Sequence, residues 1–303
     1  MRFGDERESS NWVDDGRGSG GGGFGGGGFG GGGLGCLLPL VASRFGIGGV
    51  VVLVIGYFLL TSLGGLGGGG SGTTGVPSQS QVSSTQQGQA SVDQNTRHFT
   101  LQVLASTEDT WTKLLQAKGI RYTPTKLHFY SEADQQSACG AAQTAMGPFY
   151  CPNDNSIYLD AEFFNELSQR FQAPGDFAMA YVIAHEVGHH VQDLTGTLGK
   201  AHDLQARESE TAGNATQVKV ELQADCYAGV WAANAKDPEG RPVMEPGDFE
   251  EGMKAAQAIG DDTLQKEAQG TVVPDSFTHG TSAQRMEALQ RGFKSGNMDA
   301  CTF

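Results

Sequence analysis

The sequence has little positive charge for its length. Its 303 residues contain 20 lysines and arginines against 34 aspartates and glutamates, which gives a net charge of −14. Nucleic-acid binding needs a basic surface, so this balance argues against a nucleic-acid partner. Cysteine is also scarce. Five cysteines are too few for a disulfide scaffold, although they can form one or two bridges.

Glycine, in contrast, is abundant, with 46 residues that are concentrated towards the N-terminus. Residues 1–44 are polar and then glycine-rich. Such a segment buries too little apolar surface to offset its ordering entropy, so we expect it to be disordered. Residues 64–96 consist largely of Gly, Ser, Thr and Gln, and they predict a flexible linker with a root-mean-square length of roughly 30 Å.

One uncharged apolar run lies between these two segments, at residues 45–63. A helix of that length spans about 28 Å, close to the hydrocarbon thickness of a bilayer, which predicts a transmembrane helix. A buried core helix and a cleaved signal peptide are the alternatives. Four arginines precede the run, and the next basic residue after it is Arg97. The positive-inside rule therefore predicts a single-pass protein of the inner or plasma membrane, with a cytoplasmic N-terminus and an extracytoplasmic remainder.

The remaining residues, 97–303, have the composition and size of a globular domain. Helical periodicity is found in five segments, and strand-like alternation in three. The helical segments are 99–118, 160–171, 208–235, 248–259 and 282–293, and the strands are 126–130, 149–151 and 157–160. This order predicts an α+β domain that is mainly helical with a small β-sheet. The polar stretch 200–214 is typical of a surface excursion.

A metal-binding motif lies within this domain. His185-Glu186-Val187-Gly188-His189 has the form H-E-x-x-H, and residues four apart lie on one face of a helix. His185 and His189 can therefore bind one Zn²⁺ ion, while Glu186 accepts a proton from a metal-bound water. Pro174-Gly175-Asp176 predicts the start of this helix, with Asp176 as its N-cap. A helix with two solvated or core histidines is the alternative.

A catalytic zinc usually has three protein ligands and one open position. Glu221 and Asp225 are also four apart, which places both carboxylates on one face of the helix predicted there. We expect Glu221 to bind the metal and Asp225 to accept a hydrogen bond from a ligand histidine, which fixes the tautomer of that histidine. A solvated helix face is the alternative for this pair, and His190 and His202 are rival ligands.

These motifs resemble those of the gluzincin zinc peptidases, in which H-E-x-x-H is followed some thirty residues later by E-x-x-A-D. More closely, the chain resembles a bacterial family of neutral zinc metallopeptidases. In that family a glycine-rich N-terminus, one membrane span and a linker precede a zincin-like catalytic domain. The resemblance covers essentially the whole chain and implies a zinc peptidase that acts on a peptide or protein. It is carried by the glycine run and by residues 147–152, 157–160, 184–190, 221–231 and 301–303.

The stretch around His279 is also similar to a late His…Arg stretch of membrane-linked gluzincins, in which the histidine lies by the substrate carbonyl. The resemblance implies that His279 is a catalytic residue that stabilises the transition state. Arg285, six residues on, could hold Asp225 or Glu221. This chain has Gly280 where those enzymes usually have proline. A surface histidine at the start of a helix is the alternative.

The predicted export of the domain also bears on its cysteines. The outer compartment is oxidising, and Cys36 lies on the other side of the predicted span, so an even set of four cysteines remains. We expect one disulfide between Cys139 and Cys151 and a second between Cys226 and Cys301. Four buried, reduced cysteines are the alternative.

The sequence as a whole predicts a membrane-anchored, extracytoplasmic peptidase that uses Zn²⁺, with Glu186 as its general base. The alternative is a catalytically silent, zinc-stabilised adaptor that binds partner membrane proteins through its glycine-rich arm. Turnover of a peptide library by the purified domain, abolished by metal removal, would distinguish the two.

Overall fold

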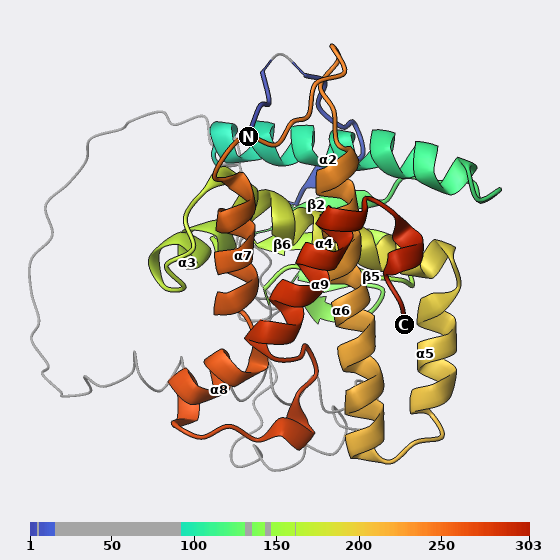
Figure 1. The fold of residues 1–303 in the computed structure, drawn as a ribbon, viewed down its shortest axis with the longest axis vertical. Coiled ribbons are helices and arrows are strands. Elements are labelled where there is room, and N and C mark those ends of the chain that lie inside the picture. The colour runs from blue at the N-terminus through green and yellow to red at the C-terminus, as the bar shows by residue number, and fades with distance from the viewer. Residues whose placement is uncertain (5, 16–91, 131–134, 143–146, 161) are drawn as a thin grey trace, which may run out of the picture.

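The structure, a computed structural model, describes residues 1–4, 6–15, 92–130, 135–142, 147–160 and 162–303. They form a helical body with a small sheet against it (Figure 1), so the predicted α+β class is confirmed. The predicted membrane span, 45–63, lies outside the described residues, as does most of the predicted linker. Within the described ranges, no helix has both the length and the apolar character that a membrane span requires.

The main sheet has four strands in the order β1-β2-β6-β5. They are β1 (Trp12–Asp14), β2 (Lys126–Tyr130), β6 (Ser156–Asp160) and β5 (Phe149–Cys151). β2 is parallel to both β1 and β6, whereas β5 is antiparallel to β6. The buried side chains of Leu127 and Phe129 alternate with His128 along β2, which gives the sheet one apolar face for the helices. A separate hairpin joins β3 (Gln135–Ser137) to β4 (Gly140–Ala142).

The first residues of the chain belong to this fold, so the predicted disorder of residues 1–44 is wrong for residues 1–4 and 6–15. Trp12 of β1 pairs with Leu127 of β2. Ser9 donates a hydrogen bond of 2.5 Å to the buried carboxylate of Glu108, and Arg7 donates one of 2.9 Å to the same group. This strand could not be predicted from the local sequence, because a strand of three residues is stable only when it pairs with its distant partner, β2.

The position of β1 constrains how the chain can meet a membrane. β1 and β2 are hydrogen-bonded neighbours, so the two parts of the chain that contain them lie on the same side of any membrane. A single span at residues 45–63 would place them on opposite sides. The predicted topology, with a cytoplasmic N-terminus and an extracytoplasmic domain, therefore does not fit the observed sheet. Arg2 and Arg7, two of the arginines behind that prediction, pair with acidic side chains of the domain.

α2 (Gln94–Gln116) is the first long helix. Asp93 caps it by accepting hydrogen bonds of 3.0 Å from the amides of Asn95 and Thr96, so the folded region begins before the predicted boundary at residue 97. The other predicted helices are present as α3 (Phe163–Gln169), α4 (Asp176–Leu194), α6 (Glu210–Asn234), α7 (Asp248–Ala258) and α9 (Ser282–Ser295).

Two further helices and two 3₁₀ turns were not predicted. α5 (Thr197–Gln205) occupies part of the expected surface excursion, and α8 (Asp261–Gln269) follows α7 directly. Both helices are short and mostly polar, so they lack the apolar periodicity that identifies a helix in a sequence. The 3₁₀ turns are η2 (Pro274–Ser276) and η3 (Met298–Ala300).

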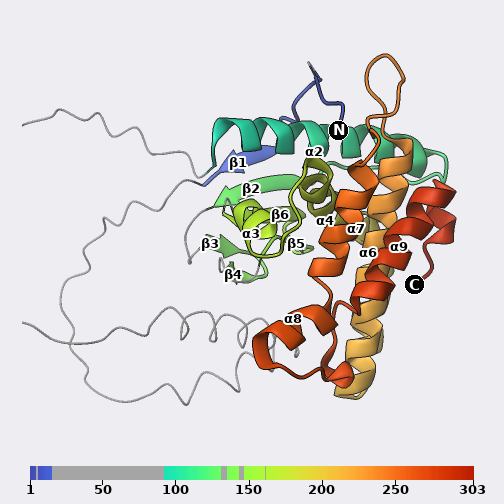
Figure 2. The same ribbon diagram turned by 60° about the vertical axis from the view of Figure 1, so that its left-hand side comes forward.

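α4 lies between the sheet and the helices α6 and α7 (Figure 2). Gly175, with φ 132°, is its N-cap, and Asp176 is its first helical residue, so the predicted N-cap is one residue too late. Gly188, inside the metal-binding motif, faces α6: a Cβ atom there would lie 3.0 Å from the carbonyl oxygen of Ala224. This glycine therefore allows α4 and α6 to approach closely, which brings the two halves of the predicted site together.

Candidate metal centre

Three predicted ligand side chains converge between α4 and α6. His185 Nε2 lies 3.1 Å from Glu221 Oε2 and 3.1 Å from His189 Nε2, and His189 Nε2 lies 3.5 Å from the same glutamate oxygen. All three side chains are buried or nearly so. Within the described residues, this is the group of histidine and acidic side chains that could hold a metal ion.

The spacing of these three atoms fits a tetrahedral metal. Metal–ligand bonds of about 2.0–2.1 Å place the ligand atoms of a tetrahedral zinc roughly 3.3–3.4 Å apart. The observed separations of 3.1, 3.1 and 3.5 Å lie on either side of that value. Two imidazoles and one carboxylate are also ligand types that zinc commonly takes, and they leave a fourth position open.

The hydrogen bonds of the two histidines also indicate that these side chains fit a metal ion. His185 Nδ1 lies 2.8 Å from Asp225 Oδ1, and His189 Nδ1 lies 2.8 Å from Gln192 Oε1. Both partners are acceptors, so each Nδ1 carries the proton. In their neutral form, the two rings direct their Nε2 lone pairs at each other and at the carboxylate of Glu221. Three converging acceptors repel one another unless a cation lies between them, so the residues fit a bound metal ion.

Asp225 is the centre of a buried network that holds His185. Its carboxylate also accepts hydrogen bonds from the Tyr181 hydroxyl at 2.5 Å and from Arg285 Nε and Nη2 at 2.9 Å each. Arg285 Nη1 donates to the carbonyl of Ile259, so the guanidinium is fixed at both ends. Of the two carboxylates considered for Arg285, it is Asp225 that the arginine holds.

The charges around His185 favour a cation at its Nε2. Burial acts to lower the pKa of His185, but Asp225, Glu221 and Glu186 outweigh burial and raise this pKa to about 10. Burial acts to raise the pKa of Asp225, but Arg285 and His185 outweigh burial and hold this pKa well below its ordinary value. A metal ion and a proton therefore compete for one strongly attractive position, while Asp225 stays ionised.

Glu221 has an orienting partner of its own. Gln217 Nε2 donates a hydrogen bond of 2.8 Å to Glu221 Oε1, which leaves Oε2 directed at the two histidines. Gln205, on α5, donates in turn to Gln217 Oε1 at 3.0 Å and to the carbonyl of Gly213. The unpredicted helix α5 thus supports the third ligand through two amides.

His279 lies in the turn before α9, and its side chain is 41% exposed. Its Nδ1 is 3.2 Å from Asp261 Oδ1, and its backbone amide donates to Asp261 Oδ2 at 2.6 Å. Burial acts to lower the pKa of His279, but Asp261 and then Glu221 raise it above its ordinary value. His279 is thus within electrostatic reach of Glu221 but is not part of the converging ligand group.

The rival ligands lie elsewhere. His190 is buried on a different face of α4, where its Nε2 contacts the carbonyl oxygen of Thr123 at 2.6 Å and its Nδ1 contacts the Tyr150 hydroxyl at 3.0 Å. His202 is an exposed residue of α5. Neither histidine joins the group formed by the two motif histidines and Glu221.

Both expected disulfides are present. Cys139 pairs with Cys151 and ties the β3–β4 hairpin to β5. Cys226 pairs with Cys301 and ties α6 to the segment after η3.

Sequence reasoning missed five polar side chains that support the ligands. Three of them had a signal in their helical spacing: Gln192 follows His189 by three residues, and Gln217 and Tyr181 each precede a ligand by four. Gln205 and Gln223 have no comparable spacing to a ligand, and Gln223 bonds to the carbonyl of Cys301, far along the chain.

Comparisons with known proteins agree with this site. A family model described as "putative neutral zinc metallopeptidase" matches residues 1–303. The uncharacterized protein YpfJ of Escherichia coli K12 is 44% identical over 305 residues, which cover 99% of this chain and 98% of that protein. The uncharacterized protein Rv2575 of Mycobacterium tuberculosis H37Rv is 40% identical over 204 residues, 65% of this chain and 66% of that protein.

No solved structure matches the chain. The family match spans every element that builds the site, from β1 to the disulfide at Cys301. The chain therefore belongs to the neutral zinc metallopeptidase family.

Proposed function

We propose that this protein is a zinc-dependent peptidase whose general base is Glu186. The observation that carries the proposal is the convergence of His185 Nε2, His189 Nε2 and Glu221 Oε2 at separations of 3.1 to 3.5 Å, beside a buried glutamate. A zinc ion held there would act as a Lewis acid towards a peptide carbonyl and lower the pKa of a water.

Glu186 supplies the proton transfer in this proposal. It follows the ligand His185 on α4, and its side chain is buried. Within the described residues, no donor forms a hydrogen bond to its carboxylate. Burial raises the pKa of Glu186, while the two ligand histidines act against that rise. A base with a raised pKa and open oxygens can accept a proton from the attacking water and later give it to the leaving amine.

The edge of the sheet provides a surface for a peptide. β5 ends the described sheet, and the Tyr150 hydroxyl contacts His190 Nδ1 at 3.0 Å and donates to Asp193 at 3.0 Å, both on α4. Backbone groups on such an edge can bind an extended peptide as an added strand. The disulfide between Cys139 and Cys151 fixes one end of this strand. We propose that substrate lies along β5, beside α4.

Glu186→Gln tests the mechanism. It removes the proton acceptor and leaves both histidines in place, so we expect unchanged zinc content and a roughly 10²–10⁴-fold loss of turnover of a quenched fluorescent peptide library. Glu267→Gln, at an exposed position on α8, is the matched control and should retain full turnover. Near-wild-type turnover by Glu186→Gln would remove Glu186 from the mechanism. Peptide binding without any wild-type turnover would favour the adaptor.

We further propose that the folded domain, including its N-terminal strand β1, lies in an extracytoplasmic compartment and is held at the membrane. Two disulfides support this location, because they persist in oxidising compartments. The pairing of β1 with β2 requires that both ends of the chain lie on one side of the membrane. Reporter fusions at each end should therefore agree, active when exported and silent in the cytoplasm. Reporters on opposite sides would mean that β1 is not paired in the membrane-bound protein.

A further inference from the structure

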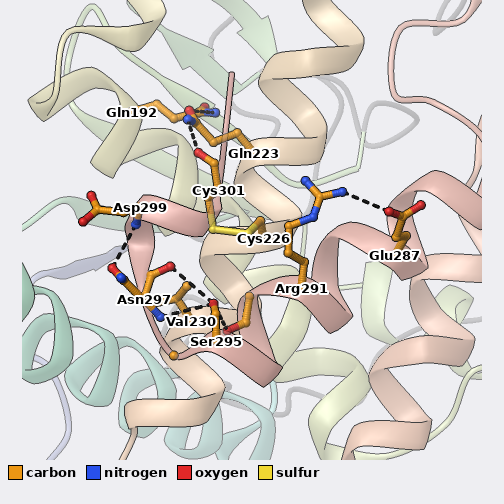
Figure 3. Close-up of a disulfide and its surroundings, with 12 residues drawn as sticks. Gln192, Gln223, Cys226, Val230, Glu287, Arg291, Ser295, Asn297, Asp299 and Cys301 are labelled. Carbon is orange, nitrogen blue, oxygen red and sulfur yellow. Dashed lines mark hydrogen bonds and ion pairs between the residues drawn. A yellow bond between two sulfur atoms is a disulfide. The ribbon is translucent and has the colours of Figure 1, made fainter.

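A chain of buried amides connects the metal ligand His189 to a disulfide. Figure 3 shows the part of this chain from Gln192 to the disulfide. His189 Nδ1 donates to Gln192 Oε1 at 2.8 Å. Gln192 Nε2 donates to the carbonyl of Val220 at 2.7 Å and to Gln223 Oε1 at 3.0 Å. Gln223 Nε2 donates to the carbonyl oxygen of Cys301 at 2.8 Å. The two glutamine side chains are 0% and 5% exposed, so water does not compete for these bonds.

The direction of every bond in this chain follows from its far end. The carbonyl oxygen of Cys301 only accepts, so Gln223 must present its Nε2 there and its Oε1 to Gln192. Gln192 must then present Nε2 to Gln223 and Oε1 to His189. An amide oxygen facing Nδ1 selects the tautomer with the proton on that atom, which leaves the Nε2 lone pair free for a metal.

The far end is held covalently. Cys301 bonds to Cys226, which lies on α6 three residues after Gln223, with 5.5 Å between the two Cα atoms. Figure 3 shows the Cys301 carbonyl directed at Gln223 and the Gln223 amide directed at Gln192. The carbonyl that sets the whole sequence of bonds is therefore positioned by the disulfide.

We propose that Gln192 and Gln223 are positioning residues that orient His189 for zinc, and that the disulfide between Cys226 and Cys301 anchors them. This inference rests on the metal centre of the proposed function but not on hydrolysis. It differs from the support of His185, which comes from a charged pair on α6 and α9. It also differs from the support of Glu221, which comes from Gln217 on α6, itself held by α5. Loss of the disulfide should therefore weaken metal binding, because His189 would no longer be held in its metal-binding tautomer.

The experiment measures zinc affinity by competition with a chromophoric chelator. Gln192→Leu should weaken zinc binding by roughly 10–100-fold, the usual effect of losing the partner of a ligand histidine. Gln223→Leu and the double change Cys226→Ser with Cys301→Ser should weaken it in the same direction. Gln265→Leu is the control for removing a buried amide, since Gln265 bonds to Ser276 and Val273, away from the ligands.

The other disulfide is the control for loss of a cross-link. Cys139→Ser with Cys151→Ser should leave zinc affinity at the wild-type value, because this bridge has no hydrogen-bonded path to a ligand among the described residues. Circular dichroism of each variant should report an intact fold.

A second readout does not involve zinc. Imidazole ¹⁵N NMR of the metal-free protein reports which nitrogen of His189 carries the proton. Wild type should hold the proton on Nδ1, and the Gln192 and Gln223 variants should show a mixture of tautomers. Unchanged zinc affinity and an unchanged tautomer in folded Gln223→Leu would overturn the proposal. If that variant does not fold, the same results for Gln192→Leu would overturn it.

The two proposals can fail separately. A wild-type protein that binds no zinc would refute the proposed function, whereas the tautomer measurement would still decide the role of Gln192. A wild-type protein that binds zinc but hydrolyses nothing would leave the positioning role intact and refute only the peptidase.

Discussion

Asp225→Asn is the substitution whose consequence the structure determines most closely. The carboxylate is 0% exposed and accepts four hydrogen bonds. They come from His185 Nδ1 at 2.8 Å, the Tyr181 hydroxyl at 2.5 Å, and Arg285 Nε and Nη2 at 2.9 Å each. Asparagine keeps the shape of the side chain but removes its charge and turns two acceptor sites into donors. The NH2 group takes the place of one oxygen: at Oδ2 its donors would face Arg285 Nε, and at Oδ1 they would face His185, Tyr181 and Arg285.

The expected cost has two parts. Arg285 is only 3% exposed, so the substitution leaves a buried guanidinium without its counter-charge, which typically costs about 3–5 kcal/mol of unfolding free energy. His185 also exchanges a charged acceptor for a neutral amide oxygen, which raises the basicity of its ring less. Mutation of such a partner usually lowers metal affinity about 10–100-fold.

Two assays separate these effects. Urea unfolding of the metal-free protein measures stability without the contribution of bound zinc, and chelator competition measures affinity. Glu287→Gln is the control, because it removes an exposed ion pair with Arg291 on the same helix as Arg285. Exposed pairs of this kind contribute about 0.3–0.5 kcal/mol. If Asp225→Asn unfolds within about 1 kcal/mol of wild type, then Asp225 is not the counter-charge that holds Arg285.

Four more substitutions test other parts of the structure. Gly292→Ala would place a Cβ atom 1.9 Å from the carbonyl oxygen of Cys226 and should destabilise by about 1–3 kcal/mol or more in urea unfolding, whereas Gly199→Ala meets no atom within 4 Å and should stabilise by about 0.4–1 kcal/mol. Burial raises the pKa of Asp160 to about 6 from 3.8, so its contribution to stability is present below pH 4 and lost as the pH rises through 6. Asp160→Asn should therefore raise the thermal midpoint at pH 7.5 and not at pH 4. His279→Ala should lower kcat/KM with zinc content unchanged, and zinc loss would make His279 a ligand.

Much of the site was readable from local sequence because helix geometry is local. His185 and His189 lie four apart, and so do Glu221 and Asp225, and any α-helix places such pairs on one face. The periodicity that predicted α4 and α6 needs no knowledge of the rest of the chain. The group of side chains that could hold a metal ion was therefore predictable from the sequence.

Contacts between distant segments were not predictable in this way. β1 is only three residues long, and its hydrogen-bonding partner begins at residue 126, so nothing around Trp12 indicated a strand. Nor were α5 and α8 indicated, because these short helices are mostly polar and contain few apolar residues. The expected disorder of the N-terminus and the expected single membrane crossing both rest on residues 1–63. No local pattern in these residues indicated that β1 pairs with β2.

The sequence by itself determined which residues can bind a metal, because spacing along a helix sets which side chains share a face. Only the tertiary structure decided how those residues are held. The approach of α4 and α6 at Gly188 brings Glu221 to the histidines, and α9 supplies Arg285 to Asp225. Which atom of Gln192 faces His189 depends on Gln223, and the orientation of Gln223 depends on the carbonyl of Cys301. Hydrogen-bond direction and burial arise from segments far apart in the chain, and they exist only once the chain has folded.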